Sequence, residues 1–210
     1  MRASLGRMPV SFVANRGRWD NRASWVAQGS EASAFFTDGG VRWALPGRDG
    51  GPGWALHQSL VGARAVHPVA SVAAPGVVSY FVGERHHPAL PTATELTAAG
   101  AWPGVDVSWA GTGGRIEATY HLAPGADPAQ IRVAWEGAEA LAVTPEGRMS
   151  VTTPARSFEE DAPRAWQTAP GGARIPVEVA FELAGPDSYG FRLGAHDPAL
   201  PLVIDPTVLL

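Results

Sequence analysis

Apolar and polar residues alternate in short runs along most of this chain. Every second residue from Arg174 to Leu183 is apolar, and a Gly185–Ser188 turn leads into a further alternating run, Tyr189–Leu193. A period of two places alternate side chains on the same face of a strand. The pattern predicts a β-hairpin here, with one face buried and the other in water.

Similar signals recur in the C-terminal half. Alternation at Val105–Trp109 and at Ile116–Leu122, on either side of a glycine-rich turn, predicts a second hairpin, and Leu141–Val151 predicts a third. Between them, Asp127 followed by Pro128 is typical of one helical turn, with the aspartate as its cap.

The N-terminal half is less regular but shows the same kind of signal. Strands are expected at Val10–Ala14 and Trp25–Gln28, a hairpin at Ala34–Leu45, and buried strands at Trp54–Val61 and Val77–Val82. A glycine-rich loop is expected at 47–53. Glycine and proline interrupt every candidate helical period.

These patterns predict an all-β fold, an antiparallel β-sandwich or open barrel with little helix. We expect a single domain over residues 1–210. The proline-rich stretch Pro88–Pro91 is too short for a linker, but it is where two β-sheet lobes, 1–90 and 91–210, would meet.

Composition narrows the functional classes. The 210 residues are 45% apolar and 17% charged, enough apolar content for a packed core. The net charge is −4, and all 16 basic residues are scattered arginines, which argues against nucleic acid as a partner. The lack of cysteine excludes disulfides and thiolate metal sites. No apolar run approaches the roughly 20 residues of a membrane span, and no leader peptide is visible.

Several phrases, in order, together resemble a bacterial family: the N-terminal all-β domain of unknown function in secreted proteins that carry SBBP (β-propeller-type) repeats. The phrases are Phe12–Gly17, Val78–Gly83, Trp102–Val107, Pro124–Pro128, Glu136–Ala138 and Pro201–Pro206. The chain departs from the family pattern at Arg18 and at Ser108-Trp109, and it ends where a repeat array would begin.

The resemblance implies a setting rather than a chemistry. It implies an extracellular or cell-surface location, with neighbouring propeller repeats or surface proteins as partners; a cytoplasmic location stays open. It implies no catalytic residue and no cofactor. We therefore expect a non-catalytic interaction or structural module.

Tryptophan is unusually frequent, with eight residues, and is the most informative part of the composition. Those at apolar strand positions are expected in the core: Trp25, Trp43, Trp54, Trp109 and Trp135. Those beside turns are expected to be partly exposed and form the candidate ligand-binding set: Trp19, Trp102 and Trp166. Exposed indoles stack on sugar rings or anchor protein interfaces, so a carbohydrate-binding module is the first alternative.

The polar candidates mostly favour structural roles. Asn15 and Gly17 are expected in a turn after the first strand, and Asp127 and Asp205 are likewise assigned to turns.

His86-His87 and the acidic run 159–161 are the nearest approaches to a metal or carboxylate site. Neither has the spacing of metal ligands, so no metal is predicted, and the acidic run is expected in a solvated loop. A glycoside-type hydrolase would need a carboxylate pair, for which Asp106, Glu117 and Glu178 are the candidates on polar strand faces; this is the second alternative.

Overall fold

The computed structural model describes residues 10–209, apart from 30, 48–50, 84 and 113. The described residues form nineteen strands and one short 3-10 helix, η2 (Pro128–Gln130), which follows β9. The first nine strands are β1 (Phe12–Ala14), β2 (Ala23–Gln28), β3 (Ser33–Thr37), β4 (Gly40–Leu45), β5 (Trp54–Leu60), β6 (Val69–Val82), β7 (Arg85–Trp102), β8 (Val105–Thr112) and β9 (Arg115–Leu122). The remaining strands are β10 (Val133–Glu136), β11 (Ala140–Val143), β12 (Met149–Thr152), β13 (Ser157–Glu160), β14 (Arg164–Thr168), β15 (Arg174–Val177), β16 (Val179–Leu183), β17 (Ser188–Leu193), β18 (Leu202–Asp205) and β19 (Thr207–Leu209).

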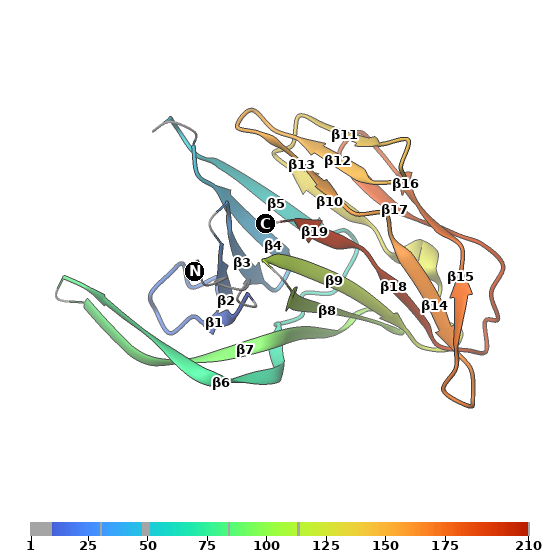
Figure 1. Ribbon diagram of the computed structural model, residues 1–210, viewed down its shortest axis with the longest axis horizontal. Coiled ribbons are helices and arrows are strands. Elements are labelled where there is room, and N and C mark those ends of the chain that lie inside the picture. The colour runs from blue at the N-terminus through green and yellow to red at the C-terminus, as the bar shows by residue number, and fades with distance from the viewer. Residues whose placement is uncertain (1–9, 30, 48–50, 84, 113, 210) are drawn as a thin grey trace, which may run out of the picture.

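All strand pairings are antiparallel and form two connected walls (Figure 1). In one wall β7 pairs with β1, and hydrogen bonding continues through β2, β3, β4, β5 and β10 to β17 and β16. In the other, β7 pairs with β8, which leads through β9 and β18 to β14 and β15. Strand β9 also pairs with β19, which reaches β13, β12 and β11. The antiparallel all-β class predicted from the alternation is confirmed, without barrel closure.

One apolar core lies between these walls. Its largest fully buried side chains come from strands far apart in sequence, among them Phe12, Phe36, Tyr120, Trp135 and Tyr189. The aromatic rings meet mostly edge to face, as in the Phe12–Phe36 pair at 5.1 Å between centroids. The core therefore draws on residues from both sides of position 90.

The hairpins predicted in the C-terminal half are present. In β8 and β9, Val107 lies opposite Tyr120 and Trp109 opposite Ala118, all four buried. Strands β11 and β12 form the hairpin predicted at Leu141–Val151. The helical turn is also confirmed, because Asp127 Oδ1 accepts a hydrogen bond from the amide of Ala129 at 2.9 Å.

The run Arg174–Leu183 is not one strand, as the alternation had suggested. It is divided at Glu178 between β15, which pairs with β14, and β16, which pairs with β17. The predicted hairpin is therefore β16–β17 alone. Because the chain changes partners at Glu178, Ile175 and Leu183 lie exposed instead of sharing a buried face.

Two stretches expected to be buried are exposed in part: the start of β5, although Leu56 and Gln58 further along it are buried, and the end of β6. Trp54 begins β5 with 38% of its surface exposed, and its indole N–H donates to the carbonyl of Gly137 at 2.8 Å. The segment Val77–Val82 is the end of β6, where Val77 is 63% and Phe81 68% exposed. An apolar run indicates a strand, but what covers the strand depends on the rest of the fold.

The long hairpin of β6 and β7 extends beyond the other strands at lower left in Figure 1, and we call it the arm. The proline-rich stretch Pro88–Pro91 lies inside β7. Here β7 bulges opposite Ser79, and the amide of Ala89 donates to the Ser79 hydroxyl at 2.9 Å. Ala89 has a φ of 52°, the left-handed region that alanine rarely adopts. The residues expected in the loop 47–53 lie partly outside the described part of the chain.

Candidate functional site

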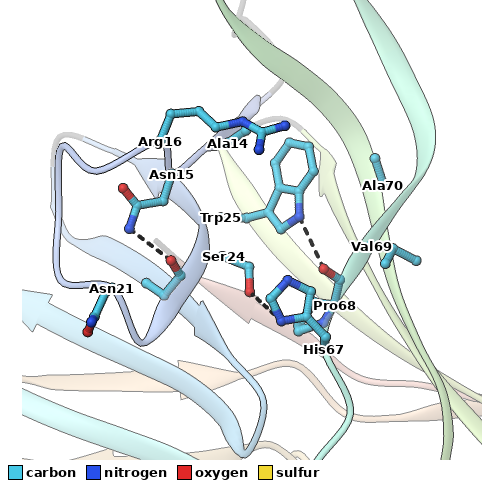
Figure 2. Close-up of a pocket in the computed structure, with 11 residues that line it drawn as sticks. Ala14, Asn15, Arg16, Asn21, Ser24, Trp25, His67, Pro68, Val69 and Ala70 are labelled. Carbon is cyan, nitrogen blue, oxygen red and sulfur yellow. Dashed lines mark hydrogen bonds between the residues drawn. The ribbon is translucent and has the colours of Figure 1, made fainter. Parts of the chain in front are cut away.

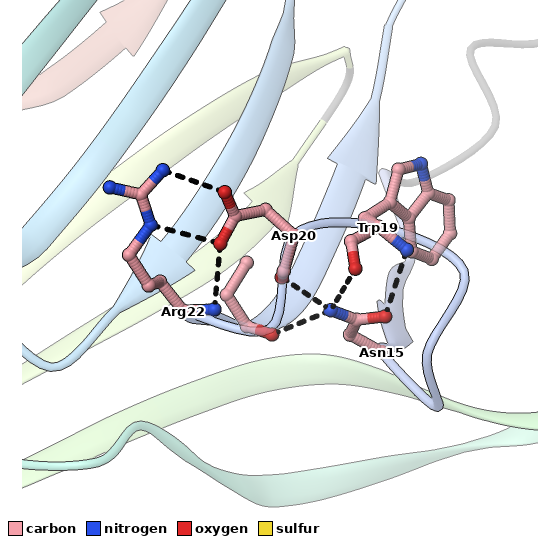
Figure 3. Close-up of polar contacts among 5 residues, drawn as sticks. Asn15, Trp19, Asp20 and Arg22 are labelled. Atoms are coloured by element: carbon pink, nitrogen blue, oxygen red, sulfur yellow. Dashed lines mark hydrogen bonds and ion pairs between the residues drawn. The ribbon is translucent and has the colours of Figure 1, made fainter.

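A loop between β1 and β2 is organised by one side chain, Asn15 (Figure 3). The Asn15 Nδ2 group donates to the carbonyls of Asp20 and Ala23, each at 2.8 Å, and more weakly to that of Trp19 at 3.4 Å. Its Oδ1 atom accepts from the amides of Gly17 and Trp19, each at 3.1 Å. Every polar atom of this amide is bound within the loop, as the sequence interpretation of a structural turn expects.

Backbone geometry and one ion pair complete the loop. Gly17 has a φ of 87°, a backbone conformation that residues other than glycine adopt at an energetic cost. Asp20 binds Arg22 through two of its guanidinium nitrogens, at 2.9 and 2.6 Å (Figure 3). The hydrogen bonds from Arg22 hold the pKa of Asp20 well below its usual range. Both residues are exposed, so this pair fixes geometry more than it adds stability.

The loop, in turn, holds the arm. The Arg18 guanidinium lies 3.9 Å from the centre of the Tyr80 ring in β6, and Trp19 meets the same ring edge to face at 5.4 Å. The Tyr80 hydroxyl donates to Gln28 of β2 at 2.7 Å. At the root of the arm, the Trp25 indole N–H donates to the carbonyl of Pro68 at 3.1 Å. One face of the arm is therefore fixed against the N-terminal strands.

A cavity of about 310 Å³ lies between this loop and the start of β6 (Figure 2). Trp25, Pro68 and Val69 form much of its apolar wall, and Arg16 lies at its upper edge in the figure. Ser24 and His67 lie on its lower side, where they are hydrogen-bonded to each other. The sequence assigned Trp25 to the core, and its hydrophobic context gave no sign that it would also line a cavity.

Ser24, His67 and Asp38 have the residue types of a hydrolase triad, but their geometry differs. Ser24 Oγ and Asp38 Oδ1 both approach the same ring nitrogen, His67 Nδ1, at 3.2 and 2.9 Å. In a triad the serine and the carboxylate bind opposite nitrogens, so that the imidazole relays a proton between them. This cluster orients the imidazole and leaves Nε2 free of both partners.

The three tryptophans proposed as ligand-binding residues occupy different environments. Trp102 is only 2% exposed and donates to the carbonyl of Val61 at 3.1 Å, so the expectation that it is exposed is wrong. Although Trp102 is the last residue of β7 and precedes Pro103, the core covers its ring. Trp166 is partly exposed, with the Arg174 guanidinium 4.5 Å from its ring centre. Trp19 is also partly exposed and is committed to Tyr80. The structure brings no two of these indoles together as a binding platform.

Strands β8, β9 and β18 present a polar outer face. Ser108 Oγ lies 2.9 Å from His121 Nε2, and Thr119 donates to Asp205 at 3.3 Å. Asp205 is the last residue of β18 and does not lie in the turn assigned to it. Its position at a strand end places the carboxyl among neighbouring side chains, and partial burial raises its pKa.

Of the three carboxylates proposed for a hydrolase, Asp106 and Glu117 lie on strands of this face, and Glu178 lies beyond it. Asp106 lies opposite His121, and Glu117 is four residues before His121 on β9. At about 3.3 Å per residue, their backbone positions lie about 13 Å apart. Glu178 follows β15, three strand spacings from β9 and therefore roughly 14 Å away. Glycosidases hold their carboxyl pair about 5–9.5 Å apart, so these positions do not form such a pair.

His86 and His87 lie near the outer end of the arm. His86 meets the Phe81 ring edge to face at 5.3 Å, and His87 pairs with Tyr80 across the hairpin. Within the described residues, no group of three His, Asp or Glu side chains is placed to hold a metal ion.

Glu160, part of the acidic run expected in a solvated loop, is instead fully buried at the end of β13. Its two oxygens accept hydrogen bonds from the Trp135 indole at 2.8 Å and the Tyr189 hydroxyl at 2.7 Å. Burial raises the pKa of Glu160 to about 7, although these two bonds oppose the shift. The buried position of Glu160 could not be seen in the sequence, because the run of three acidic residues looks uniformly polar. Its neighbours Glu159 and Asp161 are indeed accessible and pair with arginines.

The antiparallel strands around one core, with an outlying arm, define an all-β domain. Residues 12–207 match DUF7948, a domain of unknown function, and the chain belongs to this family. The match begins with the first residue of β1 and ends with the first residue of β19, so it spans the described fold. No curated protein and no solved structure matches the chain. Among the described residues, no helix has the length and apolar character to cross a membrane.

Proposed function

We propose that this domain is a non-catalytic interaction module that binds a neighbouring protein or domain through the arm. The observation that carries this proposal is the free edge of β6. Within the described residues β6 pairs with β7 alone, so the main-chain groups along its other edge face no strand. Such an edge is a template for an added strand.

The chemistry of β6 suggests the kind of partner. None of its fourteen residues is charged. Proteins protect exposed edges with charges, prolines or bulges, and β6 has Pro75 and several breaks in its register with β7 but no charge. Its exposed apolar side chains are Val69, Val72, Val77 and Phe81. An extended, uncharged strand with apolar side chains at alternate positions would satisfy the main chain and cover these residues together.

The support beneath the arm favours binding over mere flexibility. Tyr80 is held by Arg18, Trp19 and Gln28 on the inner face, while Val77 and Phe81 remain in solvent. A pre-ordered surface loses less conformational entropy when a partner binds. The Asn15 loop would thus serve the interface without touching the partner.

The setting of the domain is also part of the proposal. The resemblance to domains that precede SBBP repeats supports an extracellular or cell-surface location, with propeller-type repeats as the partner. Propellers leave only short strand edges, and β6 would pair with such an edge on the outermost strand of a blade. The glycan alternative has less support, because one of its three indoles is buried and the other two have ring or guanidinium partners.

Binding to a purified SBBP-repeat array, measured by biolayer interferometry, tests this proposal. The double variant Val77→Lys/Phe81→Lys places charges on the exposed edge and should weaken binding at least about tenfold. Val143→Lys is the matched control, because Val143 is an exposed strand valine of β11, away from the arm. Equal binding by both variants, or no binding of the wild-type domain, would contradict the proposal.

A further inference from the structure

The cavity at the root of the arm combines an aromatic wall with a cation. Trp25 is partly exposed, and its one hydrogen bond, to Pro68, lies in the plane of the indole. An in-plane bond from the ring edge leaves the ring face available. In the described residues, no other ring or guanidinium stacks on Trp25, in contrast to Trp19 and Trp166.

The polar groups of the cavity fall into two sets. Asn15 lines the cavity, but its amide is fully engaged within the loop. Asn21, Ser24 and His67 line it with hydrogen-bonding groups, and the His67 ring is oriented through Nδ1 by Ser24 and Asp38. Hydrogen-bonding groups of this kind suit hydroxyl groups on a ligand.

The charge of the cavity favours an anion. Arg16 is the one arginine among its lining residues, and no aspartate or glutamate lines it. Arg16 is exposed and has no ion pair with a described residue. A guanidinium without a carboxylate partner, at the edge of an apolar wall, suits a carboxylate on the ligand, which it can bind through two parallel hydrogen bonds.

We propose that this cavity binds a sugar unit that carries a carboxylate, of the uronic acid class. The pyranose ring would stack on the Trp25 indole, the carboxylate would bind Arg16, and the hydroxyls would bind Asn21, Ser24 and His67. The cavity volume of about 310 Å³ lies at the small end of ligand pockets, which suits one sugar ring. The cavity takes Val69 and Ala70 from the start of β6 but includes neither Val77 nor Phe81 near the other end of the strand, so sugar binding does not depend on the protein-binding role of the arm.

Titration with two sugars that differ in one group tests the proposal. The methyl glycoside of galacturonic acid, with its carboxylate free, and the methyl glycoside of galactose are added in turn to the isotope-labelled domain, and the indole N–H of Trp25 is followed by NMR. We expect a saturable shift with the acidic sugar and none with its neutral counterpart. Arg16→Gln should weaken binding of the acidic sugar at least about tenfold.

Arg132→Gln supplies the matched control, because it removes the same charge from an exposed residue outside the cavity and should leave binding unchanged. Equal shifts with both sugars, no shift with either, or an unchanged affinity in Arg16→Gln would overturn the proposal. Binding of benzoate in place of the acidic sugar would overturn it as well, since the site would then select aromatic acids. The Val77→Lys/Phe81→Lys variant should bind the sugar normally, which separates this result from the proposed function.

Discussion

The apolar residues of β8 and of β6 both predict a strand, but the two strands have opposite environments. In β8 the apolar residues Val105, Val107 and Trp109 are almost completely buried. In β6 the exposed fractions of Val77 and Phe81 exceed one half. Strand β8 lies between β7 and β9 and packs against the core, whereas β6 has one neighbouring strand. Apolar residues in a strand-like pattern therefore indicate a strand. The number of neighbouring strands decides whether those residues are buried.

The two regions also differ in what a substitution should change. In the core, removal of a side chain leaves a void or an unsatisfied polar group, so the free energy of unfolding falls. In the arm, the same removal changes a surface that water already reaches, so binding should change more than stability. The four predictions below test this contrast, in order of decreasing expected effect on stability.

The largest loss is expected for Trp135→Ala. This indole is fully buried and donates to Glu160, so its removal creates a cavity and takes one hydrogen-bond donor from a buried carboxyl group. We expect the free energy of unfolding to fall by about 3–5 kcal/mol, measured by urea denaturation. A loss below about 1 kcal/mol would mean that the core here is not closely packed.

Glu160→Gln should change how stability depends on pH. The pKa of Glu160 is about 7 in the folded domain, against a usual value of 4.5. Stability from the protonated carboxyl is therefore complete below about pH 4.5 and is lost as pH rises to 7, because the unfolded chain releases the proton first. Glutamine mimics the protonated acid at every pH. The free energy of unfolding of the variant, relative to that of the wild type, should therefore rise by about 3 kcal/mol from acid to alkaline pH.

Urea denaturation of both proteins at several pH values gives this difference, and contributions from all other groups cancel in the comparison. Circular dichroism at each pH confirms that both proteins remain folded. Parallel stability profiles for the two proteins would show that Glu160 does not retain its proton in the core.

A matched pair of valines gives the most direct comparison of the two regions. Val107→Ala in β8 removes two fully buried methyl groups and should lower the free energy of unfolding by about 2 kcal/mol. Val77→Ala in β6 should change it by less than about 0.5 kcal/mol. Thermal denaturation of the two variants side by side measures both effects. Similar losses would mean that the arm is covered in solution, for example by a second molecule.

A modest change in overall stability is expected for Asn15→Ala, about 1 kcal/mol, because the hydrogen bonds of its amide lie in a largely exposed loop. Its local effect should be larger. Once the loop loosens, Arg18 and Trp19 lose their position on Tyr80, and amide hydrogen exchange should speed up in the arm. Asp127→Ala, which removes a different capping side chain, should leave exchange in the arm unchanged.

Much of the fold could be predicted from the sequence because hairpins are local. The strands around Val107 and Tyr120 form adjacent hairpin partners, and their alternation is preserved on both sides of the turn. The division at Glu178 could not be predicted, since β15 pairs with the strand before it, β14, and β16 with the strand after it, β17, while the alternation runs through both without a break. A continuous period of two does not reveal a change of partner.

Less of the candidate site could be predicted. The structural role of Asn15 follows from its place between a strand and a glycine, and the structure agrees. The cavity joins Trp25 to His67, residues more than forty positions apart, so no short motif contains it. The solvent exposure of single side chains could not be predicted either. Trp102 is buried and Phe81 is exposed, although turn and strand signals indicate the reverse.

The left-handed backbone of Ala89 has a consequence for the mechanics of the arm. Glycine would adopt this φ of 52° with less strain, at a saving on the order of 1 kcal/mol, but it would also let the ribbon hinge at the bulge. Alanine restricts rotation there, and its amide is tied to Ser79 across the hairpin. The strained torsion angle of Ala89 thus limits bending of the hairpin at the bulge. A displacement of the outer end of the hairpin would therefore also displace its base.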